Sequence, residues 1–445
     1  MSELPVGWME LKLGDVVNYA DNTTVQPDAM QEDAWLLELE DIERDSSRIL
    51  AYETVGKRNP QSAKNSFHAG DVLYGKLRPY LNKVVRADRN GYSSSEIIAI
   101  KPNQLDGGYL FHYLKSPRFR DYVQAVTHGV RMPRLGTEQA KAAPFPLPPL
   151  AEQKRIAQKL DALLAQVDAI KARINAIPAL LKRFRSSIVE SATRGSLTSD
   201  WRTLNSTTDW VKTVIGELLK EKPRNGYSPK PVDYETKTRS LSLSATTSGK
   251  FRPEFSKFIA ETIPSGSHLW LEPGDILIQR ANTLEYVGVS ALFDGQAGNF
   301  IYPDLMMKCR AKPSVAPAFL QLVLNSKSVR KYFRDNATGT AGNMPKINQQ
   351  TVVSAPVALP IIEEQAEIVR RVEQLFAYVD QLEAKVAVAQ QRIDALTQSL
   401  LAKAFRGELV PQDPTDEPAS VLLERIRAQR AAAPKPKRGR KAATS

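Results

Sequence analysis

The sequence predicts a mixed α/β (α+β) protein in which one arrangement, a globular domain followed by a long α-helix, occurs twice. Apolar residues recur at alternating spacings of four and three over residues 156–188 and again over residues 368–400. This heptad spacing is typical of a long helix that packs one face against a partner helix. Short apolar stretches after a Gly-Asp turn precede both helices and are typical of β-strands. Because the residues flanking the helices repeat at the same offset, the chain contains an internal duplication.

The two long helices are predicted over residues 148–195 and 358–407. Each follows a proline that stands four residues before a Glu-Gln pair, and each ends at a glycine suited to a left-handed terminal residue. Their matching apolar faces predict an antiparallel coiled coil with a pseudo-twofold axis. Pro178 lies inside the first helix and is predicted to kink or split it, at a cost of about 3 kcal/mol, because proline lacks an amide hydrogen. The positions assigned to helix packing or partner docking are Ile156, Leu160, Leu163, Val167, Ile170, Ile174, Ile368, Val372, Leu375, Val379, Leu382 and Val386.

The predicted globular domains are residues 1–147 and 196–357. In each domain, short strands precede a pair of helices, which is the pattern of a mixed α/β fold. The strands are expected near residues 72–74, 84–85, 96–100, 276–278, 287–293 and 306–309, and the helical pairs over residues 109–125 and 318–336.

Proline-rich segments at residues 144–149 and 356–360 are predicted to be hinges that lead into the long helices. The polar stretches at residues 18–65 and 223–266 share little sequence. We therefore expect the two domains to differ in function within these stretches.

Residues 408–445 are predicted to form an acidic, proline-rich linker, a short helix over residues 421–430 and a disordered basic tail. Two interpretations of the tail stay open, a set of non-specific phosphate contacts or a solvated terminus. Its basic residues are Lys435, Lys437, Arg438, Arg440 and Lys441.

The composition of the 445-residue chain narrows the class of protein. Its net charge of +12 favours a polyanionic partner, because phosphate contacts by Lys and Arg release counterions. No apolar run is long enough to cross a membrane, and the N-terminal residues do not resemble a secretory signal. The single cysteine, Cys309, fits a reducing compartment and lies in an apolar run typical of a buried strand. We expect a cytoplasmic protein without a membrane partner.

Catalytic and metal-binding signatures are missing from the sequence. There is no phosphate-binding G-x-x-x-x-G-K-[ST] loop, no H-E-x-x-H motif, no paired cysteines and no G-x-S-x-G elbow. The Asn-Pro-Pro-aromatic motif of amino-methyltransferases is also missing. The sequence therefore predicts a non-enzymatic chain with no metal site and no cofactor of its own.

Three motifs carry a resemblance that covers about residues 5–425. They are Gly-Asp-Val-Leu-Tyr-Gly-Lys-Leu-Arg-Pro-Tyr at 70–80, Pro-Leu-Pro-Pro-Leu-Ala-Glu-Gln-Lys-Arg-Ile at 146–156 with its echo at 358–368, and Phe-Arg-Gly-Glu-Leu-Val-Pro-Gln at 405–412. In this order and in duplicate, they resemble the specificity (S) subunits of type I restriction-modification systems.

The resemblance implies a reader of DNA rather than a catalyst. Each globular domain would be a target recognition domain for one half of a bipartite double-stranded DNA site. The paired helices would set the spacing and dock two methyltransferase (M) subunits, to which up to two restriction/translocase (R) subunits bind. S-adenosylmethionine, ATP and Mg²⁺ would belong to those partners, which methylate adenine or cleave DNA.

Candidate DNA contacts are Lys, Arg and Asn side chains, because phosphates attract cations and base edges are read by forked donors. For each of them the alternative is a solvated surface charge. The two copies differ at one of these sites, because Gly-Lys-Leu-Arg at 75–78 corresponds to Gln-Arg-Ala-Asn at 279–282. A phosphate contact by Arg78 is therefore not expected to be shared by the second copy. The candidates are Lys57, Arg58, Lys64, Lys76, Arg78, Arg131 and Arg134 in the first domain and Arg239, Lys250, Arg252, Arg280, Asn282, Asn343 and Lys346 in the second.

Two other functions stay open on the sequence alone. A single-chain modification enzyme would methylate DNA without partners, and a coiled-coil adaptor would bind proteins with no preference for duplex DNA. The bases recognised depend on loop geometry and DNA deformation, which composition does not encode.

Overall fold

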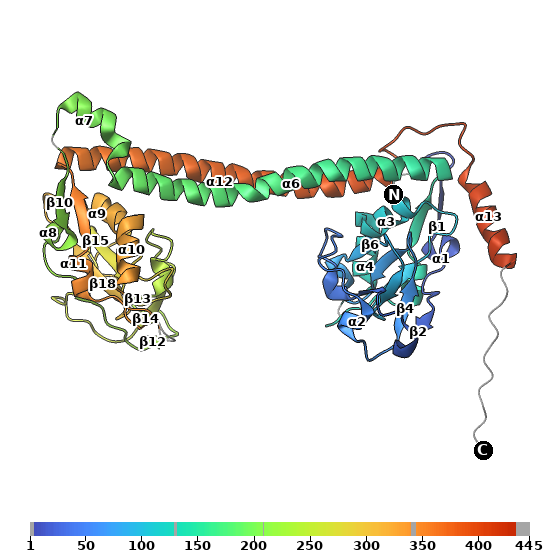
Figure 1. The fold of residues 1–445 in the computed structure, drawn as a ribbon, viewed down its shortest axis with the longest axis horizontal. Helices are drawn as coiled ribbons and strands as arrows, with labels where there is room; N and C mark the ends of the chain where they lie inside the picture. The colour runs from blue at the N-terminus through green and yellow to red at the C-terminus, as the bar shows by residue number, and fades with distance from the viewer. Residues whose placement is uncertain (1–3, 129–130, 208, 340–343, 433–445) are drawn as a thin grey trace, which may run out of the picture. The chain divides into compact units, whose positions relative to one another are not determined.

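The computed structural model describes residues 4–128, 131–207, 209–339 and 344–432 (Figure 1). The chain divides into two compact units: unit 1 contains residues 1–175 and 388–445, and unit 2 contains residues 176–387. Both divisions fall inside the long helices, α6 (Leu150–Thr193) and α12 (Ile362–Ala404). Each unit therefore contains one end of α6 and the opposite end of α12.

Unit 1 is built on a three-stranded antiparallel sheet with strand order β6-β5-β8. Alternate residues of the central strand β5 face different layers: Val72 and Tyr74 pack towards the helices, and Leu73 packs towards a second sheet of order β2-β4-β7-β3. The strands of unit 1 are β1 (Met9–Lys12), β2 (Thr24–Val25), β3 (Trp35–Leu37), β4 (Lys64–Phe67), β5 (Val72–Gly75), β6 (Val84–Arg86), β7 (Gly91–Ser93), β8 (Ile97–Ile100) and β9 (Pro144–Leu147). Its short helices are α1 (Leu13–Val16), α2 (Val55–Arg58), α3 (Gly107–Lys115), α4 (Pro117–Val126), α5 (Thr137–Lys141) and α13 (Ala419–Ala432).

Unit 2 repeats this arrangement with one more strand in the sheet, whose order is β11-β18-β15-β16. Ile276 and Ile278 of β15 pack towards the helices, and Leu277 packs towards a second sheet of order β12-β14-β13-β17. The strands are β10 (Val211–Val214), β11 (Arg224–Asn225), β12 (Pro231–Val232), β13 (Thr238–Leu241), β14 (Ser256–Ile259), β15 (Asp275–Gln279), β16 (Ser290–Leu292), β17 (Phe300–Ile301), β18 (Met306–Arg310) and β19 (Pro356–Leu359). The short helices are α7 (Ser199–Asn205), α8 (Ile215–Leu218), α9 (Pro317–Leu324), α10 (Lys327–Asp335) and α11 (Gln349–Val353).

Local hydrogen bonds explain why these elements begin where the sequence predicts. The Asp71 carboxylate accepts the amide hydrogen of His68, and the Asp275 carboxylate accepts that of Glu272, both at 2.9 Å, so each aspartate closes the turn before its strand. The hydroxyl groups of Ser116 and Ser326 cap the N-termini of α4 and α10. The predicted strands and helical pairs are confirmed, although the strand expected over 287–293 is shorter.

The proline-rich hinges were predicted wrongly, because they are strands. Residues 144–147 (β9) pair antiparallel with β1, and residues 356–359 (β19) pair antiparallel with β10. Each pair is a separate two-stranded sheet, so each strand has one edge without a neighbouring strand. A proline whose nitrogen faces that edge removes no hydrogen bond between the strands. The strand β9 is also held from α3, because the carbonyl oxygens of Pro144 and Pro146 accept hydrogen bonds from the hydroxyl groups of Tyr113 and Tyr109.

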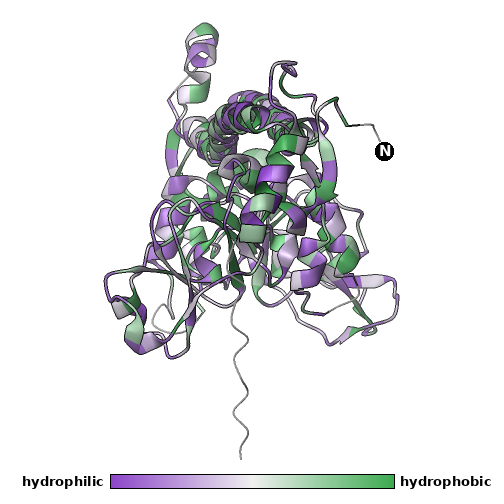
Figure 2. Cartoon of the chain, turned by 90° about the vertical axis from the view of Figure 1, so that its right-hand side faces the viewer, coloured by the Kyte–Doolittle hydropathy of each residue, from purple (hydrophilic) through white to green (hydrophobic). Residues whose placement is uncertain are grey.

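The expectation that Pro178 splits the first long helix is also wrong, because α6 is one helix over 44 residues with Pro178 inside it. The fixed φ of proline is compatible with a helix, and the helix continues despite a lost backbone hydrogen bond and the crowding of the ring against the carbonyl four residues earlier. Both hydrophobic and hydrophilic residues occur in the long helices (Figure 2), a mixture that a helix with one apolar face requires. The helix predicted over residues 421–430 is α13, and the basic tail lies outside the described residues. In the described part of the chain, no helix is long and apolar enough to cross a membrane.

Candidate nucleic-acid interface

The two units share a loop frame that carries several of the predicted DNA contacts. In unit 1, the amide of Leu135 donates to the carbonyl of Lys76 at 2.9 Å, and the amide of Arg78 donates to the carbonyl of Pro133 at 2.8 Å. In unit 2, the corresponding bonds run from Ile347 to Arg280 and from Asn282 to Pro345, at 2.9 and 3.2 Å. The backbone is thus held in the same way while the side chains at the corresponding positions differ.

In unit 1, this frame presents two exposed arginine residues. Arg78 has a φ of +49°, and its side chain is exposed. Because a residue other than glycine rarely adopts a positive φ, the frame holds Arg78 in a strained backbone conformation. The exposed guanidinium of Arg134 pairs with Glu96 at 2.8 Å, and Lys76 is half-buried.

In unit 2, two of the side chains at the corresponding positions form hydrogen bonds with neighbouring residues. Arg280 donates weakly to the carbonyl of Asp304 at 3.4 Å, and Lys346 is exposed. The amide group of Asn282 donates to the side-chain oxygen of Gln279 at 2.7 Å and accepts the backbone hydrogen of Thr283 at 2.7 Å.

Three further candidates in unit 1 are already paired with carboxylates. Arg58 binds Asp41 at 2.6 Å, and Lys64 binds Glu38 at 2.7 Å, with all four side chains largely buried. Each of these two cations therefore already has a carboxylate partner within the unit, and its contact with phosphate stays a prediction. Lys57 pairs with Glu53 but is 71% exposed, and Arg131 is exposed.

Among the remaining candidates in unit 2, one packs on an aromatic ring and two are exposed near carboxylates. The guanidinium of Arg239 lies 4.9 Å from the ring centroid of Phe258, which fits packing on an aromatic face. Lys250 lies 3.3 Å from Asp380, and Arg252 lies 4.0 Å from Glu254, and both basic side chains are exposed. Asn343 lies outside the described residues.

The apolar heptad positions predicted for helix packing or partner docking, called the seam positions below, lie on one face of each long helix. Ile156 and Leu160 join the core of unit 1, and Ile368, Val372 and Val379 join the core of unit 2. Val167 is also buried, whereas Ile170 is 49% exposed. The remaining seam positions are partly buried: Leu163, Ile174, Leu375, Leu382 and Val386.

Within each unit, the two helices run in opposite directions. In unit 1, Lys171 pairs with Asp394 at 2.6 Å, and Asn175 accepts a hydrogen bond from Gln390 at 3.0 Å. In unit 2, Arg185 pairs with Glu383 at 3.1 Å and also with Asp380, and it lies over the ring of Phe376. Residue numbers rise along α6 as they fall along α12, as an antiparallel pair requires.

The Glu-Gln pair at the start of each long helix ties that helix to its unit, a role that the sequence analysis missed. In unit 1, the indole nitrogen of Trp8 donates to Glu152 at 2.9 Å. The side chain of Gln153 accepts the amide of Asp106 and donates to the carbonyl of Pro148, both at 3.0 Å. Burial raises the pKa of Glu152, and the hydrogen bond from Trp8 opposes that rise.

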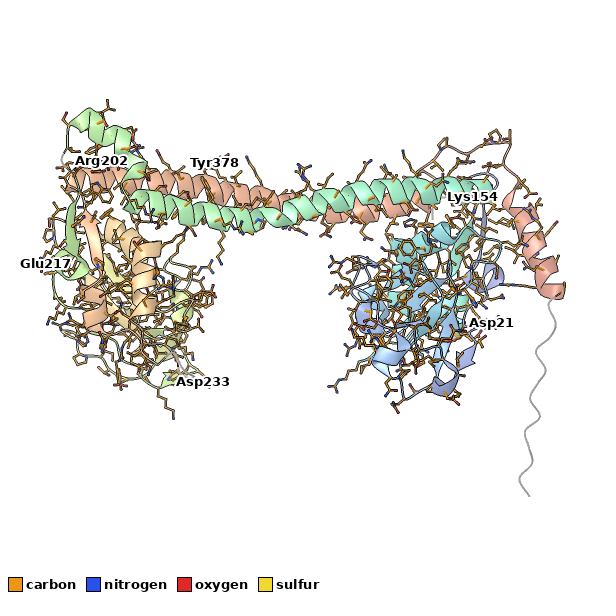
Figure 3. The ribbon with its side chains drawn as sticks, in the orientation of Figure 1. Asp21, Lys154, Arg202, Glu217, Asp233 and Tyr378 are labelled. Atoms are coloured by element: carbon orange, nitrogen blue, oxygen red, sulfur yellow. The ribbon has the colours of Figure 1, made fainter. Side chains whose placement is uncertain are left out.

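Unit 2 repeats the junction with more partners. Trp210 donates to Glu364 at 3.0 Å, and Glu364 also accepts hydrogen bonds from Thr198 and Arg202. Figure 3 labels Arg202 on α7, close to the beginning of α12. Gln365 accepts the amide of Ala316 at 2.8 Å, as Gln153 accepts that of Asp106. The repeated tryptophans and Glu-Gln pairs were visible in the sequence, but only the fold reveals that they meet.

Among the described residues, no group of three or more His, Cys, Asp or Glu side chains could hold a metal ion. Cys309 is buried in β18, and burial raises the pKa of its thiol to about 12. A thiol with this pKa is protonated at neutral pH and a weak nucleophile.

The family profile named "Type I restriction modification DNA specificity domain" matches residues 5–179. The chain is 37% identical to the type I restriction enzyme EcoKI specificity subunit of Escherichia coli strain K12, over 77% of this chain and 76% of that protein. It is 34% identical to the StySPI specificity subunit of Salmonella potsdam, over 78% of this chain and 76% of that protein.

Two solved structures share the fold. One comes from a study of complex assembly and conformational transition of the type I R-M system, with a TM-score of 0.70 and 19% identity over 92% of this chain and all of that chain. The other is the HsdS subunit from Thermoanaerobacter tengcongensis, with a TM-score of 0.59 and 20% identity over 92% of this chain and 99% of that chain. The sequence relatives decide the assignment: the chain belongs to the specificity subunits of type I restriction-modification enzymes.

Proposed function

We propose that this specificity subunit recognises a bipartite double-stranded DNA site and that each globular domain reads one half. The observation that carries the proposal is the shared loop frame with unlike side chains. Arg78 and Asn282 occupy equivalent positions on equivalent backbone hydrogen bonds, and so do Arg134 and Lys346. A constant frame with variable polar side chains fits two readers of different base sequences.

The charge of the chain supports this proposal. A net charge of +12 favours duplex DNA, whose phosphates supply most of the sequence-independent affinity. Exposed cations such as Lys57, Arg131 and Lys346 would contact phosphates, whereas Arg78 and Asn282 would reach base edges.

We also propose that the long helices act together as one antiparallel coiled coil with a pseudo-twofold axis. In this proposal, the helices set the distance between the two half-sites and dock two methyltransferase subunits, which can add up to two restriction/translocase subunits. The antiparallel ion pairs in each unit and the repeated junctions support this arrangement. S-adenosylmethionine, ATP and Mg²⁺ would bind to the partner subunits, where adenine methylation or cleavage would take place.

Expressing this chain with its neighbouring methyltransferase gene product and sequencing the methylated DNA tests the proposal. We expect methylated positions within two short, fixed half-sites separated by an unspecified spacer. Replacing residues 200–355 with the corresponding domain of another family member should change one half-site and preserve the other. A change in both halves would contradict the division of labour.

The same preparation tests the docking role of the helices. Co-purification of the methyltransferase with the wild-type chain is expected. If a soluble chain forms no complex, the docking proposal fails and a protein-binding adaptor becomes the better interpretation.

A further inference from the structure

We propose that Gln279, buried at the end of β15, is a specificity-determining positioning residue that orients the amide of Asn282 to read adenine. The inference rests on the proposed function, because it assigns a base to one of the proposed reading positions. It starts from the difference between Gln279 and its counterpart in unit 1, which is Gly75.

The surroundings of Gln279 permit only one orientation of its side-chain amide. Its nitrogen lies within hydrogen-bond distance of three acceptors, the carbonyl of Leu243 at 2.9 Å and the hydroxyl oxygens of Thr246 and Thr247, both at 3.0 Å, which share its two hydrogens. A backbone carbonyl can only accept a hydrogen bond, so the nitrogen of Gln279 must face Leu243. The side-chain oxygen of Gln279 then faces Asn282.

This orientation is passed on to Asn282. The oxygen of Gln279 accepts a hydrogen bond from the amide nitrogen of Asn282 at 2.7 Å, and the backbone hydrogen of Thr283 donates to the amide oxygen of Asn282, also at 2.7 Å. An asparagine amide has two donor hydrogens and two acceptor lone pairs. Within the part of the chain that the structure describes, one donor and one acceptor of Asn282 therefore stay available to a ligand.

A fixed donor beside a fixed acceptor is the complement of adenine in the major groove. Adenine presents the N7 acceptor and the N6 donor there, and asparagine binds both at once. Guanine presents two acceptors at the same edge and would leave the oxygen of Asn282 facing an acceptor. An amide that could turn over would discriminate less well than one with a fixed orientation.

The backbone around Asn282 is also held from a second side. Arg330 of α10 is buried, and its guanidinium donates to the carbonyl of Glu285 at 2.7 Å and to that of Val287. The amide of Gly288 closes the loop by donating to the carbonyl of Gln279 at 2.6 Å. The segment from Asn282 to Gly288 is thus ordered before any ligand arrives, which lowers the entropic cost of binding.

The described residues of unit 1 form no equivalent of this arrangement. A Cβ added to Gly75 would lie 2.7 Å from a methyl group of Leu39, so the space that Gln279 fills in unit 2 is apolar and occupied in unit 1. Position 75 therefore offers no side chain that could orient Arg78 in the way that Gln279 orients Asn282. The positioning role is specific to the second domain.

The test uses the assembled complex of the full chain with its methyltransferase subunit. The affinity of the complex is measured on duplexes that carry each of the four bases at each position of the second half-site, because a methylation rate would require adenine at the methylated position whatever Asn282 does. The wild-type complex should prefer adenine at one position by roughly 10- to 100-fold, the range expected for one bidentate contact. Asn282→Ala and Gln279→Leu should both reduce that preference to within about threefold, with the first half-site unchanged.

Gln321→Leu is the matched control, because the side-chain nitrogen of Gln321, like that of Gln279, donates to backbone in unit 2, here to the carbonyls of Gly249 and Ser290. Gln321 makes no hydrogen bond to Asn282. It should preserve the adenine preference. Gln279→Glu is the second variant at the site: it keeps the size and polarity of the side chain, but a carboxylate cannot donate to the carbonyl of Leu243. Thermal unfolding of each complex identifies a variant that fails to fold.

The outcomes separate the inference from the proposed function. If the wild-type complex methylates a bipartite site but Gln279→Leu and Gln279→Glu keep the full adenine preference, the positioning role is overturned. An equal loss at both half-sites would also overturn it, because a defect in assembly would then explain the effect. If the wild-type complex recognises no bipartite site, the proposed function itself fails.

Discussion

The sheets of the two units differ in a way that separates scaffold from recognition surface. The sheet beneath the helical pair has the same order in both, since β6-β5-β8 of unit 1 corresponds to β16-β15-β18 of unit 2. In the second sheet of unit 1, β7 lies between β4 and β3, whereas in unit 2 β13 lies between β14 and β17. The sheet that packs against the helices thus has the same topology in both units, whereas the second sheet has a different strand order.

The junctions between the units and their long helices differ in redundancy. Glu152 depends on Trp8 for its one short hydrogen bond, because Gln412 lies at 3.4 Å, whereas Glu364 has Trp210, Thr198 and Arg202. A buried carboxylate with several donors tolerates the loss of one better than a carboxylate with a single strong donor. The same fold therefore contains one fragile and one robust junction.

The largest effect is expected from a charge in the helix seam. Val379 and Val167 are equivalent seam residues, exposed by 0% and 6%. Val379→Asp should lower the free energy of unfolding by about 3–5 kcal/mol because it buries an unpaired charge in the core of unit 2. Val167→Asp should cost less. Thermal unfolding of both variants measures the difference. Equal losses of stability would contradict the expectation that Val379 contributes more to the packing than Val167.

The next effect compares the two junctions directly. Trp8→Phe should lower the stability of the protein by about 2–3 kcal/mol, since it leaves Glu152 buried without its main donor. Trp210→Phe should cost roughly 1 kcal/mol, because Arg202 and Thr198 still donate to Glu364. Urea unfolding measures both changes, and the reverse order would refute the assignment of the fragile junction to unit 1.

A pH-dependent effect is expected at Lys115 in unit 1, whose pKa burial lowers to about 8. Between pH 8 and about 10.4 the unfolded chain binds more protons at this lysine, so its burial destabilises the fold most below pH 8. Lys115→Met should therefore raise the stability of the protein by about 2 kcal/mol at pH 7 and by less at pH 10. The equivalent residue of unit 2, Asn325, hydrogen-bonds the backbone of Ser290 and provides no such titration.

Denaturation at pH 7 and at pH 10 measures this effect. A stabilisation of equal size at both pH values would show that packing, rather than the buried charge, is responsible.

The last comparison concerns DNA affinity. Arg78→Ala should weaken binding of the methyltransferase complex to its first half-site by about 1–3 kcal/mol if Arg78 reads a base. A phosphate contact would instead lower the slope of log affinity against log salt by about 1 and weaken all sequences alike. Titrations on specific and scrambled duplexes at several salt concentrations distinguish the two roles.

The sequence by itself determined the duplication, the heptad seams and the order of strands and helices in each unit. These features depend on local periodicity and on turn residues such as Asp71 and Asp275, which act on their immediate neighbours. The likeness of the motifs to one family was also visible, because the motifs recur in order.

Only the tertiary structure decided which charges are available and which polar groups meet. Arg58 and Lys64 are predicted phosphate contacts, and only folding reveals that they also pair with the carboxylates of Asp41 and Glu38. The hydrogen bonds from Trp8 to Glu152 and from Asn282 to Gln279 follow from packing. Proline-rich residues 144–147 form a strand because β1 lies beside them. Such pairings join residues that are distant in sequence or depend on side-chain direction, so no local pattern encodes them.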